Sequence, residues 1–161
     1  MNDFDPLEDD DAAPRPMALG RTLGVDLGDR AVGLALSDPL GLTAQGLPTM
    51  ERKGDRADVA TLHGLCTERE VTRVVLGLPR NMNGSEGPRA AKSRAFALRL
   101  REEIALPVFL WDERLSTAEA ERILIAADVS RRKRKTLIDR LSAQVILQGY
   151  LDAGQPENDP A

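Results

Sequence analysis

Three acidic residues stand among apolar neighbours, where a carboxylate is costly to bury. Asp26 lies inside the run GVDLG, Glu113 follows the run VFLW, and Asp139 lies within LIDRLSAQVIL. A carboxylate in such a setting needs a cationic partner, because an isolated charge is expensive in an apolar environment. For any one of the three, an ion pair or an edge position explains the residue as well as chemistry does. Three together indicate convergence on a shared cation.

The residue types available limit which cation these carboxylates can share. The chain contains one histidine, His63, and one cysteine, Cys66, which excludes an internal disulfide and a cysteine-based zinc cluster. Carboxylate oxygens are the ligands that hard cations such as Mg²⁺ and Mn²⁺ prefer. We therefore expect the three acids to bind Mg²⁺ or Mn²⁺. His63 and Cys66 lie on or next to the apolar stripe of one expected helix, and we interpret both as structural.

A strongly basic run precedes the segment that carries Asp139. Its five consecutive members are Arg131, Arg132, Lys133, Arg134 and Lys135. Such a run is more often a solvated turn than a binding site, but its place beside the candidate acids favours contacts with phosphates. Arg114, next to Glu113, is a further candidate for the same role. No aromatic residues are interleaved with the basic run, so base stacking is not expected to be the main source of affinity.

The net charge of −4 conceals a difference between the ends and the middle of the chain. Residues 1–18 hold six acidic residues and one arginine, and residues 155–161 hold two acidic residues. Residues 19–154 therefore carry a net charge of +3. Affinity for nucleic acid follows local charge, so this region is a candidate to bind it. We expect disordered tails at 1–18 and 155–161 around one domain at 19–154.

The hydrophobic patterning predicts hairpin strands first and alternating helices and strands afterwards. Strands are expected at residues 21–27, 31–37, 45–50, 73–78 and 108–111. Helices are expected at residues 55–70, 88–103, 116–127 and 135–153. The third helix would open with a capping box formed by Ser116 and Glu119. This order predicts an α/β fold with a mixed sheet and helices on both of its faces.

The last expected helix offers a way to bring two of the acids together. Asp139 would share one face of it with Ser142, Ala143 and Ile146, at spacings of three, four and seven residues. Small side chains on that face would let the helix approach the sheet closely. Ordinary helix–sheet packing explains the small residues equally well, but it does not explain the acid. We expect Asp139 to lie near Asp26.

Five segments of the chain together resemble the YqgF/RuvX family. They are GVDLGDRAVGLALSD from Gly24, VLGLPRNMNGSEGP from Val75, FALRL from Phe96, PVFLWDERLSTAEAE from Pro107 and SRRKRKTLIDRLSAQVILQGYLD from Ser130. The resemblance covers about residues 20–153. It implies an RNase H-like fold, with a five-stranded mixed sheet of three antiparallel and two parallel strands flanked by helices. It also implies that Asp26, Glu113 and Asp139 form the catalytic, metal-binding site.

Two positions depart from the pattern of that family and its neighbours. Asn83 stands where family members often have aspartate, so a ligand role is not expected there. RuvC-type resolvases carry a fourth acid one helical turn beyond the helical one, and Ser142 stands at that place here. The second departure weakens the interpretation of the chain as a RuvC-type resolvase.

The resemblance implies a metal-dependent endonuclease that hydrolyses phosphodiesters, with two Mg²⁺ or Mn²⁺ ions about 3.5–4 Å apart. Its expected role is the maturation of the 5′ end of pre-16S ribosomal RNA in ribosome biogenesis. The alternatives are a Holliday junction or branched-DNA resolvase in recombination and repair, and an RNA-binding ribosome-assembly factor that does not cut. A monomer can trim RNA, whereas symmetric cutting of a junction requires a homodimer.

The sequence gives no sign of an association with membranes. No apolar run approaches the length of a membrane span. The acidic segment MNDFDPLEDDD is also unlike the basic start of a signal peptide. We expect a cytoplasmic protein whose partner is structured RNA or branched DNA.

Overall fold

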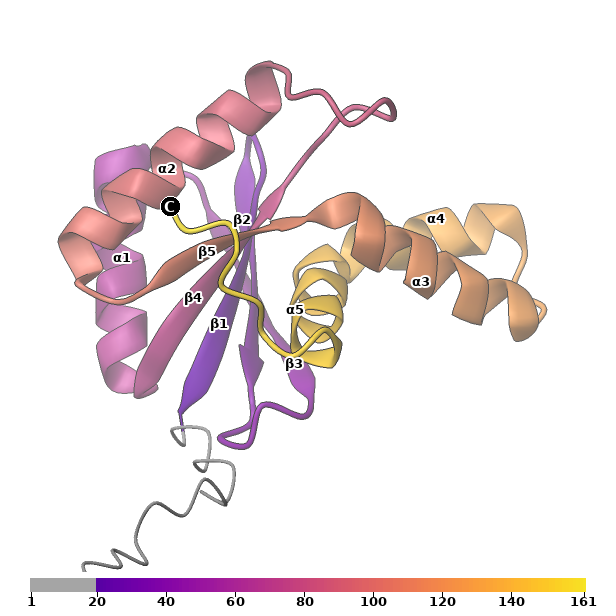
Figure 1. Ribbon diagram of the computed structural model, residues 1–161, viewed down its shortest axis with the longest axis horizontal. Coiled ribbons are helices and arrows are strands. Elements are labelled where there is room, and N and C mark those ends of the chain that lie inside the picture. The colour runs from indigo at the N-terminus through magenta and orange to yellow at the C-terminus, as the bar shows by residue number, and fades with distance from the viewer. Residues whose placement is uncertain (1–19) are drawn as a thin grey trace, which may run out of the picture.

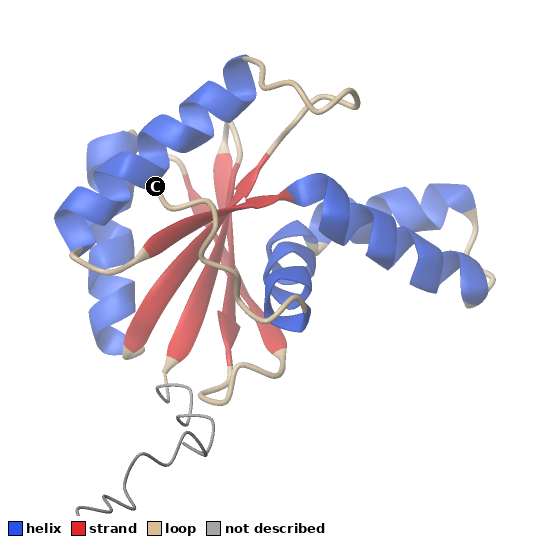
Figure 2. Ribbon diagram, viewed as in Figure 1, coloured by secondary structure: helices blue, strands red, loops and turns tan. Residues whose placement is uncertain are grey.

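The computed structural model describes residues 20–161 and is built around a five-stranded mixed sheet (Figures 1 and 2). The strands are β1 (Arg21–Leu27), β2 (Ala31–Ser37), β3 (Ala44–Glu51), β4 (Val71–Leu78) and β5 (Val108–Asp112). Their order in the sheet is β3-β2-β1-β4-β5. Strands β1, β2 and β3 pair antiparallel, whereas β4 and β5 run parallel to β1. The predicted α/β fold and mixed sheet are confirmed, while the expected tail at 1–18 lies outside the described residues.

Helices cover both faces of this sheet. They are α1 (Asp55–Glu68), α2 (Pro88–Ile104), α3 (Glu113–Ala126), α4 (Arg131–Arg140) and α5 (Ser142–Asp152). Helices α1 and α2 cover one face and α5 the other, while α3 and α4 extend beyond the sheet (Figure 1). Among residues 20–161, no helix has the length and apolar character needed to cross a membrane.

Strand β4 shows why its sequence is apolar without interruption. Val74 and Leu76 pack into the core formed with α1 and α2, while Val75 between them packs against α5. A central parallel strand is buried on both faces, so the usual alternation of polar and apolar residues disappears. Cys66 is buried in the α1–α2 core, as expected of a structural residue, whereas His63 is exposed on α1.

Glycines on the α5 face of the sheet let this helix approach closely. A Cβ atom on Gly24 would lie 2.8 Å from Leu147 Cβ, and one on Gly33 would lie 3.3 Å from Ala143 Cβ. Larger residues at these two strand positions would push α5 away from the sheet. The close contact fixes the start of α5 beside Asp26, whose Cβ lies 3.4 Å from the same Gly33 position.

The last expected helix is two helices, so the prediction of one continuous helix is wrong. The chain breaks at Leu141, with φ −108° and ψ 18°. Helix α5 packs on the sheet and α4 packs beside α3, which gives the two helices different directions (Figure 1). No glycine or proline marks the break, so tertiary packing sets it rather than local propensity. Asp139 and Ser142 consequently lie on different helices.

Helix α3 begins at Glu113, which is earlier than the sequence predicts. Asp112 caps it, with its side chain accepting a hydrogen bond of 3.0 Å from the Arg114 backbone N–H. Ser116, the expected capping residue, is buried in the first turns and accepts a 2.6 Å hydrogen bond from Trp111 Nε1. The predicted capping box is therefore wrong, although Glu113 still follows β5 directly.

Residues 155–161 run back along β5, where the sequence predicts a disordered tail. The Leu110 N–H donates to the carbonyl of Asp159 at 2.8 Å, and the Ala161 N–H donates to the carbonyl of Val108 at 2.9 Å. Strand β5 is an edge strand with unpaired backbone groups, and this C-terminal segment pairs with some of them. The prediction of disorder is wrong because hydrogen bonding to an open edge does not require apolar residues.

The two acids of this segment are paired rather than solvated. Glu157 lies 2.6 Å from Arg73, and Asp159 lies 3.4 Å from Arg94. Both arginines come from elements of the domain, β4 and α2. The C-terminal segment therefore contributes ion pairs as well as backbone hydrogen bonds to the edge of the sheet.

The close contact of α5 predicts the effect of a single added methyl group. Gly24→Ala should destabilise the protein by about 1–3 kcal/mol, because Leu147 and the α5 backbone must shift. Gly64→Ala is the matched control, since a Cβ at Gly64 in α1 meets nothing within 4 Å. That change should stabilise the helix by about 0.5–1 kcal/mol. Urea unfolding of both variants measures the difference, and equal stability of the two would contradict the close contact.

Candidate active site

Asp26 and Glu113 meet at the carboxyl-terminal edge of the parallel strands. Asp26 lies near the end of β1, and Glu113 follows β5, while β4 runs between these strands. Gly77 of β4 leaves room for the second acid, because a Cβ there would lie 2.7 Å from Glu113 Oε1. The two carboxyl groups are within hydrogen-bonding contact of each other. The sheet topology thus brings together two of the three acids predicted from the sequence.

Burial and the neighbouring acid both change the protonation of Glu113. Desolvation, followed by the charge and hydrogen bonding of Asp26, raises the pKa of Glu113 to about 7. The positive charge of Arg89 opposes this rise. Ser142, in the first turn of α5, donates a hydrogen bond from its hydroxyl to Asp26 Oδ2. Two carboxylates this close cannot both be charged cheaply unless a proton or a cation lies between them.

Asp139 lies nearby but apart from the pair. It is exposed on α4 and lines a hollow of about 290 Å³ together with Asp26, Arg140 and Ser142. Within residues 20–161, no three His, Cys, Asp or Glu side chains are close enough to hold one metal ion together. Asp26 and Asp139 therefore share a hollow, whereas only Asp26 and Glu113 are in contact.

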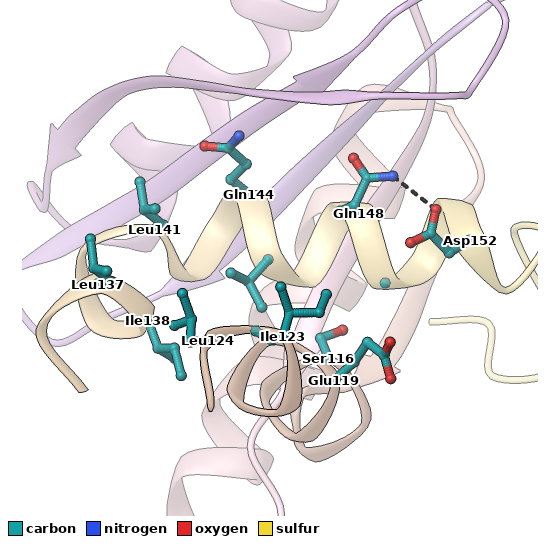
Figure 3. A pocket seen from close by; sticks show the side chains of 13 residues that line it. Ser116, Glu119, Ile123, Leu124, Leu137, Ile138, Leu141, Gln144, Gln148 and Asp152 are labelled. Atoms are coloured by element: carbon teal, nitrogen blue, oxygen red, sulfur yellow. Dashed lines mark hydrogen bonds between the residues drawn. The ribbon is translucent and has the colours of Figure 1, made fainter. Parts of the chain in front are cut away.

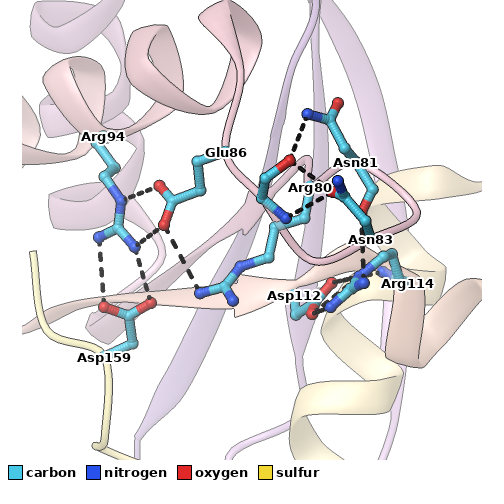
Figure 4. Close-up of polar contacts among 9 residues, drawn as sticks. Arg80, Asn81, Asn83, Glu86, Arg94, Asp112, Arg114 and Asp159 are labelled. Carbon is cyan, nitrogen blue, oxygen red and sulfur yellow. Dashed lines mark hydrogen bonds and ion pairs between the residues drawn. The ribbon is translucent and has the colours of Figure 1, made fainter.

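Arg114 is engaged in contacts that the sequence did not indicate. Its guanidinium donates to Asp112 Oδ2 at 2.7 Å, and Nη1 donates to the carbonyls of Asn81 and Met82 at 3.3 Å each (Figure 4). Pairing with Arg114 lowers the pKa of Asp112. Arg114 therefore holds the loop 79–87 against the start of α3, and its expected contact with phosphate stays a prediction.

Hydrogen bonds within the loop 79–87 fix its turn. Asn83 Oδ1 accepts from the Ser85 N–H at 3.0 Å and from the Ser85 hydroxyl at 2.5 Å (Figure 4). Asn81 donates from Nδ2 to the same hydroxyl at 2.9 Å. Asn83 thus accepts local hydrogen bonds here. This is consistent with the expectation that it is not a metal ligand.

Ion pairs connect the same loop to α2 and to the C-terminal segment. Glu86 lies 2.5 Å from Arg94, which also contacts Asp159, and its second oxygen lies 3.8 Å from Arg80 (Figure 4). The hydrogen bond from Arg94 is the main reason that the pKa of Glu86 is lowered. The loop beside the two carboxylates is therefore held from two sides, by Arg94 and by Arg114.

Four of the five predicted basic residues are exposed, and they lie in the first turns of α4 instead of a loop. They are Arg131, Arg132, Lys133 and Lys135. Arg134 instead turns back, and its Nη1 donates to the carbonyl of Val129 at 2.8 Å. Ser130 caps the helix through a bond of 3.4 Å from the Lys133 N–H. The four exposed side chains present positive charge on the helix whose last turn carries Asp139.

A groove between α3, α4 and α5 has a different character (Figure 3). It has a volume of about 300 Å³ and is lined largely by aliphatic side chains such as Leu124, Leu137 and Val145. None of the three candidate acids is among the described residues that line it. Its polar lining residues, such as Glu119, Gln148 and Asp152, are not among the candidate acids, so the groove is not the candidate active site.

The fold has a recognisable relative among solved structures. The structure of Thermus thermophilus RuvC in complex with a Holliday junction substrate superposes with a TM-score of 0.59 at 12% identity. The match covers 88% of this chain and 99% of that one. RuvC-like resolvases have an RNase H-like fold, so this chain has the predicted RNase H-like fold.

Sequence comparison identifies the family within this class. The model of the RuvX family, described as "Holliday junction resolvase", matches residues 20–153, and the chain belongs to this family. A protein of Myxococcus xanthus named "Putative pre-16S rRNA nuclease" is 57% identical over 136 residues, 84% of this chain and 90% of that protein. A Geobacillus kaustophilus protein of the same name is 57% identical over 135 residues, which are 83% of this chain and 98% of that protein. The resemblance predicted from the five segments is confirmed.

The raised pKa of Glu113 predicts a pH-dependent stability in the presence of a chelator. The folded protein favours the protonated carboxyl, so this stabilisation is complete below about pH 4.5 and is lost as the pH rises through about 7. Glu113→Gln stays neutral throughout. The variant should therefore gain on the order of 3 kcal/mol relative to wild type between pH 4.5 and pH 8.

Urea unfolding with EDTA at both pH values measures this gain. Glu102→Gln removes one exposed acid from α2 and controls for the change in net charge. An identical stability difference between wild type and Glu113→Gln at the two pH values would contradict the buried carboxylate pair.

Proposed function

We propose that this protein is a metal-dependent endonuclease that hydrolyses phosphodiester bonds in pre-16S ribosomal RNA and trims its 5′ end. The observation that carries the proposal is the contact between the carboxyl groups of Asp26 and Glu113 at the carboxyl-terminal edge of the sheet. Relatives with 57% identity over nearly their whole length carry the name of such a nuclease, which supports the same substrate.

The donor atoms at this edge suit a hard divalent cation. Asp26 and Glu113 would hold Mg²⁺ or Mn²⁺ through carboxylate oxygens, which are the ligands that these ions prefer. A cation between them would relieve the repulsion that raises the pKa of Glu113. Asp139 lines the same hollow as Asp26 and is the candidate third ligand. One or two such ions supply activation of water and stabilisation of the leaving oxygen.

Residues around the acids orient them and admit the substrate. The Ser142 hydroxyl fixes Asp26 Oδ2, and Gly77 leaves the space that Glu113 occupies. Arg114 holds the loop 79–87 against the start of α3, next to Glu113. A reaction that depends on alignment benefits from supports of this kind, because small displacements of the reacting groups reduce the rate steeply.

The exposed basic residues of α4 would bind the backbone of the nucleic acid. Arg131, Arg132, Lys133 and Lys135 present positive charge on α4, the helix whose last turn carries Asp139. Contacts with phosphate position the strand without reading its sequence. This agrees with a substrate recognised by its structure, as expected of a nuclease that trims a folded RNA.

Two other functions are compatible with the family. The family description favours cleavage of Holliday junctions, which would require a homodimer to cut two strands symmetrically. Ser142 weighs against this alternative, because it binds Asp26 at the place where RuvC-type resolvases carry a fourth acid. A non-cutting assembly factor has no need of a half-buried acid pair. We therefore favour RNA trimming, by a monomer in the cytoplasm.

The proposed chemistry predicts that neutralising Asp26 separates binding from cleavage. Asp26→Asn should lower the single-turnover cleavage rate by about 10³-fold or more, while the Kd for substrate changes by less than about threefold. Combining it with Glu113→Gln should add little, because residues acting as a unit are not additive. The measurement uses pre-16S RNA and branched DNA across a series of Mn²⁺ concentrations.

Asp128→Asn is the control, since this exposed acid lies in the loop between α3 and α4. It should leave both the cleavage rate and the Kd unchanged. Equal cleavage rates for wild type and Asp26→Asn on both substrates would overturn the assignment of Asp26.

Replacing Arg131, Arg132 and Lys133 together by Ala should weaken binding for every sequence tested. Each lost phosphate contact should lower the slope of log Kd against log salt by about 0.7–0.9, so the triple variant should lose about 2. Arg134→Ala is the matched contrast within the same helix, because Arg134 is bound to Val129, and should leave the slope unchanged. A triple variant with the wild-type slope would contradict the role of α4.

A further inference from the structure

A second hollow opens at the same edge of the sheet, on the face covered by α1 and α2. It has a volume of about 440 Å³ and lies between the β1–β2 turn, the start of α1 and the start of α2. The polar and charged side chains that line it are those of Asp29, Arg52, Asp55, Arg89, Lys92 and Ser93. No step proposed above uses this hollow.

The side of the hollow formed by α1 is already neutralised. Arg52 bonds to Asp55 at 2.5 Å, to Asp58 at 2.7 Å and to the carbonyl of Gly28 at 2.9 Å. Asp55 and Asp58 also place negative charge in the first turn of α1, where the partial positive charge of the helix would otherwise attract an anion. The α1 side therefore closes the hollow and does not bind an anion.

The side formed by α2 has free donors instead. Its N-cap is Gly87, which has no side chain to cap the helix, and its first turn contains no acid. Arg89 and Lys92 are exposed and form no ion pair with any residue in the range 20–161. Two cations that pair with no described acid therefore line one space whose single exposed acid is Asp29.

Ser93 is an independent sign that this space takes a ligand. The residue is only 2% exposed and lines the hollow, yet its hydroxyl has no hydrogen-bond partner among the described residues. A hydroxyl that lines a hollow and has no partner among the described residues can donate to an acceptor bound there. An anion with several acceptor oxygens fits the hydroxyl, the ammonium of Lys92 and the guanidinium of Arg89 at once.

We propose that this hollow binds a phosphate of the substrate strand that flanks the scissile bond, with Lys92 and Ser93 as its main contacts. The inference rests on the proposed nuclease function. Arg89 lines the hollow, and its charge also acts on Glu113, so the hollow lies close to the acid pair. The hollow would thus position the strand and set which bond reaches Asp26 and Glu113.

A charge-deletion series tests the subsite by binding alone. In a set of RNA oligonucleotides, one phosphate at a time is replaced by an uncharged methylphosphonate, and the Kd for wild type is measured in EDTA. One position next to the cleavage site should weaken binding by about 5–10-fold. The variant with both Lys92→Ala and Ser93→Ala should bind unmodified RNA about 5–10-fold more weakly and should be insensitive to that position.

The controls separate this subsite from general electrostatics and from misfolding. Arg56→Ala removes an exposed charge from the first turn of α1, outside the hollow, and should keep the sensitivity of wild type. Lys92→Glu changes only an exposed side chain, so it provides a folded variant if the double variant unfolds. A Lys92 variant that keeps the wild-type dependence on the phosphate position would overturn the proposal.

A titration with inorganic phosphate separates failure of the subsite from failure of the nuclease. Phosphate at millimolar concentration should shift the NMR amide resonances of residues 89–93 in wild type, and Lys92→Glu should abolish the shifts. Those shifts without any binding of RNA would refute the nuclease function and the flanking phosphate that rests on it, leaving only an anion site. Cleavage of RNA without the shifts and without a sensitive phosphate position would overturn the subsite and leave the nuclease intact.

Discussion

The close contact between α5 and the sheet determines where the candidate acids Asp26 and Glu113 lie. Gly24 and Gly33 form the floor on which α5 rests, and no larger residue fits at Gly24 without moving the helix. On its other side, α5 meets α3 closely as well, because a Cβ on Gly149 would lie 2.1 Å from the Ser116 hydroxyl. Helix α5 thus places Ser142 against Asp26. It also fixes the position of the first turn of α3, which begins with Glu113. The geometry of the acid pair follows from packing between backbones rather than from attraction between the acids.

It matters that packing sets the position of the acid pair, because two carboxylates repel each other. Asp26 and Glu113 are held together by the packing of the elements that carry them, and desolvation, followed by the charge of Asp26, raises the pKa of Glu113 to about 7. Strain of this kind persists at functional sites when the surrounding structure over-determines it. A cation or a proton relieves it, so the metal-free protein contains a site prepared for positive charge.

The sequence predicted the strands and the acid pair because both have local signals. An uninterrupted apolar run marks β4, and the apolar neighbours of Asp26 and Glu113 mark acids that need compensation. The break at Leu141 and the path of residues 155–161 have no such signal. The break at Leu141 depends on the different surfaces that α4 and α5 pack against. The path of residues 155–161 depends on the open edge of β5, which is distant in sequence. The separation of Asp139 from the pair follows from the first of these, and so escaped prediction.

The arrangement of positive charge shows why net charge is a poor guide to what this protein binds. An acid pair at the edge of the sheet repels a phosphate backbone, so binding a strand there requires compensating cations close by. Exposed cations that pair with no described acid include Arg89 and Lys92 on α2 and the basic residues at the start of α4, the helix that carries Asp139. Other basic residues, such as Arg52, Arg94 and Arg114, are bound to acids and hold loops in place. A chain with a net charge of −4 can therefore still present clusters of cations, because six of its acids lie in its first eighteen residues and others are paired with arginines.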